Sequence, residues 1–218
     1  SASKGSMDAE NISITSGNNI VNNGSKINSD NLIMQSEGSI INKDGDINSD
    51  SMALISGNNI ENIAGNISGK DILLSAANDV VNKSELQRGR YETASIDSET
   101  LHVSAGNDVS LVGSELSASG EANFIAGDQF TSEGASISAD DGLLISATDV
   151  NLLAVKDVDD YYKFEQYSRG NSKRVETHSE DVIGTQLESN GVLKINASND
   201  IYSKGTNFSG EEGIALAA

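Results

Sequence analysis

The chain has 218 residues, no cysteine and no proline, and a formal net charge of −19. This acidity argues against nucleic acids and anionic membranes as partners, because both repel a negatively charged surface. The lack of cysteine excludes a disulfide framework and a thiolate metal site. We find no apolar run of 18 or more residues, so we expect no membrane span.

A unit of about twenty residues repeats along the chain. Each copy has two apolar residues with one residue between them, followed by a corner such as Gly-Asn-Asn. An apolar residue comes directly after the corner, and another follows seven positions later. Repeats of this length are typical of solenoid proteins, in which each repeat buries its apolar residues against its neighbours. The first four copies are Ile12, Ile14, Gly17, Ile20 and Ile27; Leu32, Met34, Glu37, Ile40 and Ile47; Met52, Leu54, Gly57, Ile60 and Ile67; and Ile72, Leu74, Ala77 and Val80.

The first residue of each corner measures the spacing of the repeats. Its equivalents lie 20 or 21 residues apart, except for one step of 29 residues and one step of 50. We therefore predict about nine coils of 20–21 residues, with insertions at residues 82–95 and 154–186. Because the pattern runs from end to end, we expect residues 1–218 to be a single segment of a longer array. The equivalents are Gly17, Glu37, Gly57, Ala77, Gly106, Gly127, Thr148 and Ser198.

The apolar residues of a coil alternate with polar ones, which predicts strands with one buried face. The period is too short for a strand and a full helix, and Gly, Asn and Asp tolerate the backbone of a tight corner. Each strand would then pair in parallel with its equivalent in the next coil. The sequence thus predicts an all-β fold, a parallel β-helix, which we take as right-handed from the general preference of parallel crossovers.

A leucine-rich-repeat horseshoe has a similar period and is the main alternative fold. That fold needs leucine at several fixed positions and a helical arc. In this chain Ile, Val, Met and Phe replace one another freely, and no arc has helical spacing. We therefore favour the β-helix.

The two insertions hold most of the unusual side chains. Their 47 residues contain eight of the 14 basic residues and five of the nine aromatic residues. In the longer one, partial alternation over residues 161–167 and a returning segment at 173–177 predict a β-hairpin with its turn near residues 168–171. Aromatic and basic side chains make good interface anchors, although the same cluster would also suit packing flat on the solenoid wall. The candidate partner-binding residues are Tyr161, Tyr162, Lys163, Phe164, Tyr167, Arg169, Lys173 and Arg174.

Three segments carry a family resemblance: HVSAGNDVSLVGSELSASG at 102–120, LLISATDVNLLAV at 143–155 and LKINASNDIYSKGTNFSG at 193–210. They resemble the repeats of the filamentous haemagglutinin family, large exoproteins of Gram-negative bacteria secreted by the two-partner route. The family includes adhesins and the stalks of contact-dependent growth inhibition toxins. The resemblance implies a right-handed β-helix and a non-catalytic structural or adhesive stalk on the outer cell surface. It implies two partners, an outer-membrane transporter and a receptor or glycan on a host or target cell.

The alternative function is a polysaccharide lyase or hydrolase, because such enzymes also use β-helices, with carboxylates clustered on one face. The densest acidic run is Asp157, Asp159 and Asp160, and we interpret it as solvated loop charge. The histidines His102 and His178 lack the neighbours that a zinc site needs. The corner Asn and Asp residues are interpreted as turn formers. We therefore predict no catalytic, cofactor or metal site.

Overall fold

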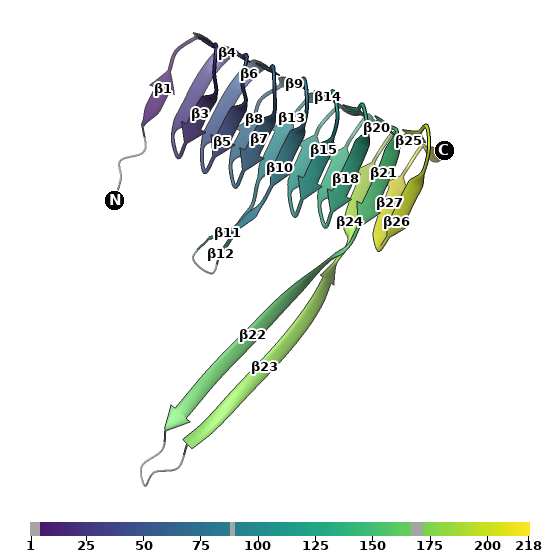
Figure 1. Ribbon diagram of the computed structural model, residues 1–218. Coiled ribbons are helices and arrows are strands. Elements are labelled where there is room, and N and C mark those ends of the chain that lie inside the picture. The colour runs from purple at the N-terminus through teal and green to yellow at the C-terminus, as the bar shows by residue number, and fades with distance from the viewer. Residues whose placement is uncertain (1–4, 88–89, 167–171) are drawn as a thin grey trace.

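Each coil forms up to three short strands, and each strand pairs in parallel with the equivalent strand of the next coil (Figure 1). The computed structural model describes residues 5–87, 90–166 and 172–218, and it describes no side chains within 86–91 and 157–181. Every element in these ranges is a strand. The prediction of an all-β parallel solenoid of about nine coils is confirmed.

The first face of the solenoid carries the paired apolar residues of the repeat. Its ladder runs from Ile12 through Leu32, and it ends with Leu193 and Ile214. The strands of the first face are β2 (Asn11–Ser16), the second halves of β4 (Lys26–Ser36) and β6 (Asp46–Ser56), β9 (Asp71–Ala76), β14 (Thr100–Ala105), β17 (Glu121–Ala126), β20 (Gly142–Ala147), β25 (Val192–Ala197) and β28 (Gly213–Ala217).

The second and third faces close each coil. The second face is an eight-stranded sheet, whereas the third face joins the first in one 16-stranded sheet because β4 and β6 run on through the corner between them. The strands of the second face are β3 (Ile20–Asn23), β5 (Ile40–Lys43), β7 (Ile60–Ile63), β10 (Val80–Lys83), β15 (Val109–Val112), β18 (Gln129–Glu133), β21 (Asp149–Leu153) and β26 (Ile201–Lys204). Those of the third face are β1 (Ser6–Asp8), the first halves of β4 and β6, β8 (Asn66–Ser68), β13 (Ser95–Ser98), β16 (Glu115–Ala118), β19 (Ser136–Ala139), β24 (Thr185–Ser189) and β27 (Thr206–Gly210).

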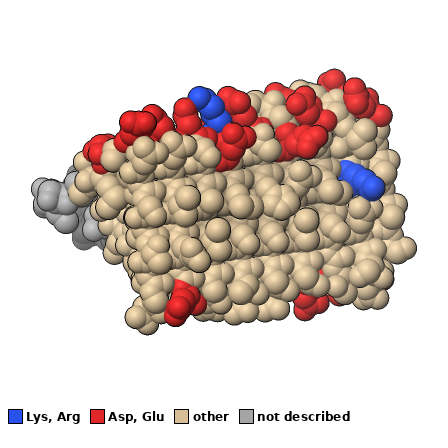
Figure 2. Space-filling model, turned by 90° about the horizontal axis from the view of Figure 1, so that it is seen from above, with Lys and Arg blue, Asp and Glu red and all other residues tan. Residues whose placement is uncertain are grey.

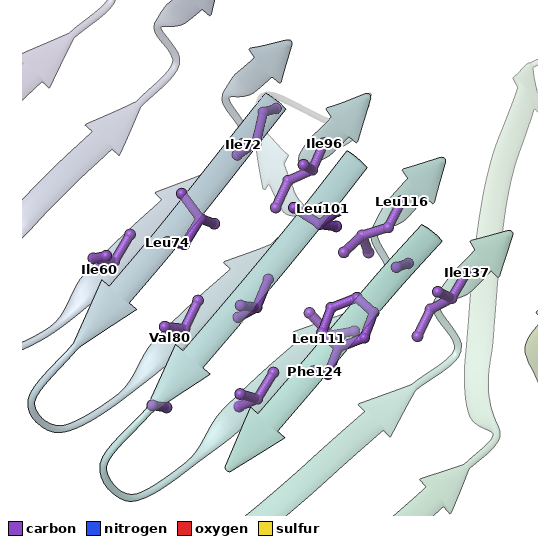
Figure 3. Close-up of a cluster of buried hydrophobic side chains, with 14 of the residues drawn as sticks. Ile60, Ile72, Leu74, Val80, Ile96, Leu101, Leu111, Leu116, Phe124 and Ile137 are labelled. Carbon is purple, nitrogen blue, oxygen red and sulfur yellow. The ribbon is translucent and has the colours of Figure 1, made fainter. Parts of the chain in front are cut away.

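The core is a single column of apolar side chains that point inward from all three faces (Figure 3). The inward positions of the middle coils are buried. Those of the terminal coils, such as Ile14, Ile20, Ile201 and Phe208, are only partly buried because the solenoid covers them on one side only. Phe124 and Phe130 are fully buried in this core and make an edge-to-face contact, with ring centroids 5.6 Å apart. Stacked aliphatic side chains supply most of the remaining burial.

An asparagine column lies on the inner side of the second face, at Asn22, Asn42, Asn62 and Asn82. Each of the first three donates through Nδ2 to the Oδ1 of the next, at 2.7–2.8 Å. The same amides donate to a backbone oxygen three residues on, at 2.9–3.0 Å. The column ends at Asn82 because Leu111 takes the next position, and the buried Nδ2 of Asn82 has no hydrogen-bond partner among the described residues.

The corner between the second and third faces, which we call the second corner, has a left-handed backbone in most coils. Its first residue has a positive φ in six coils, between 49° and 73°. Glycine adopts this backbone without strain, and Asp44 and Ala64 adopt it here as well. In the two remaining coils the same corner position is taken by Ser84 and Ala154. Their backbone N–H groups donate to the next coil, as the N–H of Gly24 does. A hairpin follows each of them. The six residues with positive φ are Gly24, Asp44, Ala64, Gly113, Gly134 and Gly205.

Candidate functional site

Two antiparallel hairpins leave the solenoid at the second corner and project on the same side (Figure 1). The short hairpin consists of β11 (Glu85–Gln87) and β12 (Arg90–Glu92). The long hairpin consists of β22 (Val155–Gln166) and β23 (Ser172–Ile183). The sequence predicted only the longer one. A step of 29 residues marked the position of the short hairpin but not its form.

A buried hydroxyl group closes the base of each hairpin. The Ser84 hydroxyl donates to the backbone oxygen of Gly113 at 2.6 Å and accepts from the backbone N–H of Ala94 at 2.9 Å. The Thr185 hydroxyl lies 2.9 Å from the backbone oxygens of both Ser132 and Leu153. Both hydroxyls tie the chain to the coil at the point where the hairpin begins or ends. The parallel ladder therefore continues beneath both hairpins.

A groove of about 560 Å³ runs along the second corner between the two hairpin bases. Ser84 lines one end, and Val155 and Ile183 of the long hairpin line the other. A side chain at Gly134 would place its Cβ 2.5 Å from the Val155 side chain, so the corner fits closely against the hairpin. Ile183 is 45 % exposed. The base of the long hairpin thus offers apolar surface to solvent.

Six of the eight predicted partner-binding residues lie on the half of the long hairpin that is farther from the solenoid. We call this the far half, residues 161–166 and 172–177, and the remainder of the two strands the near half. In the register, Lys163 is opposite Val175 and Phe164 is opposite Arg174. Tyr167 and Arg169 lie outside the described residues. The hairpin fold therefore brings the predicted residues of β22 next to the predicted residues of β23. The six are Tyr161, Tyr162, Lys163, Phe164, Lys173 and Arg174.

Charge is distributed unevenly along the long hairpin. The near half has one basic residue, Lys156, and five acidic ones, and the register sets Asp157 opposite Asp181. The far half has three basic residues and two acidic ones. The far half is therefore slightly positive, opposite in sign to the chain as a whole, whereas the near half is negative like the rest of the chain. Asp157, Asp159 and Asp160 all lie on β22 in the near half, and their side chains are outside the described part of the chain.

The first face carries few charges on its outer side. Of the three outward positions in each of its strands, only Asp71, Glu121 and Lys194 are charged. Figure 2 shows this face, nearly free of charge, with a row of acidic side chains along one edge. This row, which we call the acidic edge, occupies the corner between the third and first faces. It contains Glu10, Asp30, Asp50, Glu99, Asp141 and Glu212, with Lys70 among them.

Lys70 interrupts the acidic edge and neutralises part of it. Its Nζ lies 2.7 Å from Oδ2 of Asp50. The hydrogen bond to Asp50 raises the pKa of Lys70, and the negative charges of Asp50, Glu99 and Asp30 raise it further. A cation on this edge is therefore stabilised by carboxylates from several coils.

Within the described ranges, no three or more His, Cys, Asp or Glu side chains are grouped so as to hold a metal ion. His102 is half-buried on the outer side of the first face. The same part of the chain contains no helix that is long and apolar enough to cross a membrane.

The long hairpin and the coils that follow it also carry the match to a known family. Residues 165–218, from the end of β22 to β28, match the family model described as hemagglutinin repeat. This segment is similar to a hemagglutinin repeat. The match covers about a quarter of the chain, and it confirms the resemblance to the repeat region of filamentous haemagglutinins. No curated protein and no solved structure matches the chain. The hemagglutinin repeat and the solenoid together fit a stalk segment of the adhesin type.

Proposed function

We propose that this chain is a non-catalytic stalk segment of a large exoprotein on the outer surface of a Gram-negative bacterium, and that its long hairpin is a binding element. The observation that carries the proposal is the hairpin itself. Its twelve cross-strand pairs form a separate two-stranded sheet. Twelve residues of antiparallel strand reach about 40 Å. An isolated ribbon of this kind is marginally stable in water, which favours a role in contacting a partner.

The solenoid is suited to hold such an element in place. The backbone of Ala154 pairs with Lys204 of the next coil, and that of Gln186 pairs with Ala135 of the preceding one. Both ends of the hairpin are therefore anchored in continuous ladders. The proposed partners are a receptor or glycan on a host or target cell, and an outer-membrane transporter for export of the complete protein by the two-partner route.

Deletion of the long hairpin tests the proposal. Residues 155–184 are removed together with the substitution Ala154→Gly, so that the new glycine and Thr185 form a plain corner like Gly134 and Ala135. Beads coated with the chain are incubated with cultured epithelial cells and with Gram-negative bacteria. We expect the deletion to abolish attachment to one of these cell types and to leave the melting temperature nearly unchanged.

The matched control removes the short hairpin, residues 85–93, with Ser84→Gly at the same corner. This control should attach as the full chain does. Unchanged attachment after loss of the long hairpin would reject the binding role. A lower melting temperature with aggregation would indicate that the long hairpin shields apolar surface of the solenoid wall.

The enzymatic alternative is tested by incubating the chain with a panel of polysaccharides and measuring release of reducing ends. We expect no turnover. Any turnover that a single Asp or Glu substitution abolishes would replace the stalk proposal by a carbohydrate-active enzyme.

A further inference from the structure

The first face contains an apolar depression beside the acidic edge. Three successive coils place Ile33, Ala53 and Leu73 in one outward column. They line a shallow depression of about 450 Å³, and Ile33 is 51 % exposed. Such a surface suits an aromatic side chain, because moving its ring out of water lowers the free energy.

Carboxylates border this depression on one side. Asp30 and Asp50 directly precede the strand segments that carry Ile33 and Ala53, and Glu99 follows in the same edge. Lys70 shows how a cation can bind at this edge, since its Nζ forms an ion pair with Asp50 of the adjacent coil. The depression and its border therefore fit a ligand that combines aromatic rings with Lys or Arg.

We propose that the far half of the long hairpin of one copy docks on this depression and the adjoining acidic edge of a second copy. The inference rests on the proposed function, because it names a partner for the same hairpin. By residue type, the aromatic residues of the far half match the apolar depression, and its basic residues Lys173 and Arg174 match the acidic edge. The two surfaces differ, so the contact is heterologous and links copies into open chains.

The acidic edge of a second copy complements the excess of basic residues in the far half. Two chains of net charge −19 repel each other, and the repulsion is smallest where the basic far half meets the charge-poor first face. The hairpin leaves the second corner, between the second and third faces, whereas the depression lies on the first face. The acidic near half also disfavours contact with the acidic solenoid from which the hairpin leaves. The geometry therefore favours contact between copies.

Sedimentation velocity of the complete 218-residue chain tests this contact. The tip variant carries Lys173→Glu and Arg174→Glu, and the edge variant carries Asp30→Lys and Glu99→Lys, which leaves the pair of Lys70 with Asp50 intact. We expect the unaltered chain to associate at concentrations up to about 1 mM. Each variant alone should associate at least about tenfold more weakly than the unaltered chain. Added salt should also weaken association.

Mixing the two variants is the decisive arm. The edge variant has an intact hairpin and the tip variant has an intact edge, so an equimolar mixture should form a one-to-one complex. Control variants reverse charges elsewhere, with Asp97→Lys and Glu188→Lys on the third face, and Lys83→Glu and Lys204→Glu on the second. All four residues are exposed, and these controls should associate like the unaltered chain.

Several results would overturn the inference: a chain that stays monomeric at about 1 mM, variants that associate as the unaltered chain does, controls that lose association equally, or a mixture that stays monomeric. If the chain is monomeric but bead attachment still needs the long hairpin, the second copy is not the partner and the proposed function stands. If the mixture associates but beads attach without the hairpin, the proposed cell-binding role fails instead.

Discussion

The asparagine column allows a paired substitution whose two members differ in hydrogen bonding alone. Asn62 accepts from Asn42 at 2.8 Å, and its Nδ2 donates to Asn82 at 2.7 Å and to the backbone oxygens of Gly65 at 2.9 Å and Ser95 at 3.2 Å. Asn82 accepts a hydrogen bond from Asn62, and within the described part of the chain its own Nδ2 has no partner. Leu111 occupies the next position of the column, so leucine fits the space.

We therefore compare Asn62→Leu with Asn82→Leu. The gain from burying an apolar side chain is similar in both and cancels in the comparison. The two amide hydrogens of Asn62 serve three acceptors, so Asn62→Leu loses the equivalent of three hydrogen bonds, one accepted and two donated, at about 1 kcal/mol each. Asn82→Leu loses one hydrogen bond and removes an unpartnered donor worth about 1–3 kcal/mol. Asn62→Leu should thus be less stable than Asn82→Leu by about 3–5 kcal/mol.

For a chain of this size that difference corresponds to roughly 6–20 °C in melting temperature. The assay is thermal and urea unfolding followed by far-UV circular dichroism, with both variants measured in one buffer. Equal melting temperatures, or a lower one for Asn82→Leu, would refute the hydrogen-bond reasoning. Such a result would mean that the column is held by its packing and not by its amides.

Three further predictions concern the core, a corner and a surface carboxylate. Leu101→Asn should destabilise the chain by several kcal/mol, because it places an amide at a fully buried position. The measurement is the melting temperature, and an unchanged melting temperature would contradict the register. Gly106→Ala should lower the melting temperature while Gly142→Ala does not, because a Cβ at Gly106 would lie 2.0 Å from a backbone oxygen of the preceding coil, whereas at Gly142 the nearest atom is 3.7 Å away. The Asn28 amide holds the pKa of Asp8 below its ordinary value. This contribution to stability is present above the ordinary pKa and is lost as the pH falls through the lowered one, so Asn28→Ala should raise the Asp8 pKa in an NMR titration.

Periodicity was sufficient to predict the solenoid, because each inward position recurs in every coil. Leu101 and Val103 are buried, as their alternation indicates. The left-handed backbone at Asp44 and Ala64 was not predictable, because neither residue type requires it. The inward asparagines were also missed, because Asn in a repeat with glycine corners reads as a turn former. Their burial depends on contacts with the next coil, which a single repeat does not contain.

The candidate site was predictable only in part. Clustered aromatic and basic residues, and the partial alternation from Tyr161 to Tyr167, indicated the long hairpin. The sequence did not indicate that both hairpins leave one corner, because this depends on which residue of the coil each insertion follows. Nor did it reveal the acidic edge, since Asp30, Asp50 and Glu99 are neighbours only after the coils stack.

The base of the long hairpin determines how the molecule responds to mechanical load. A pull on the hairpin enters the solenoid through Ala154 and Thr185, which connect to β21 and β24. Each of these strands is hydrogen-bonded to a neighbour on both sides. Extraction would have to break both ladders together with the hydroxyl bonds of Thr185. The hairpin is thus attached as a tether, and tension on it is shared among several coils of the rod.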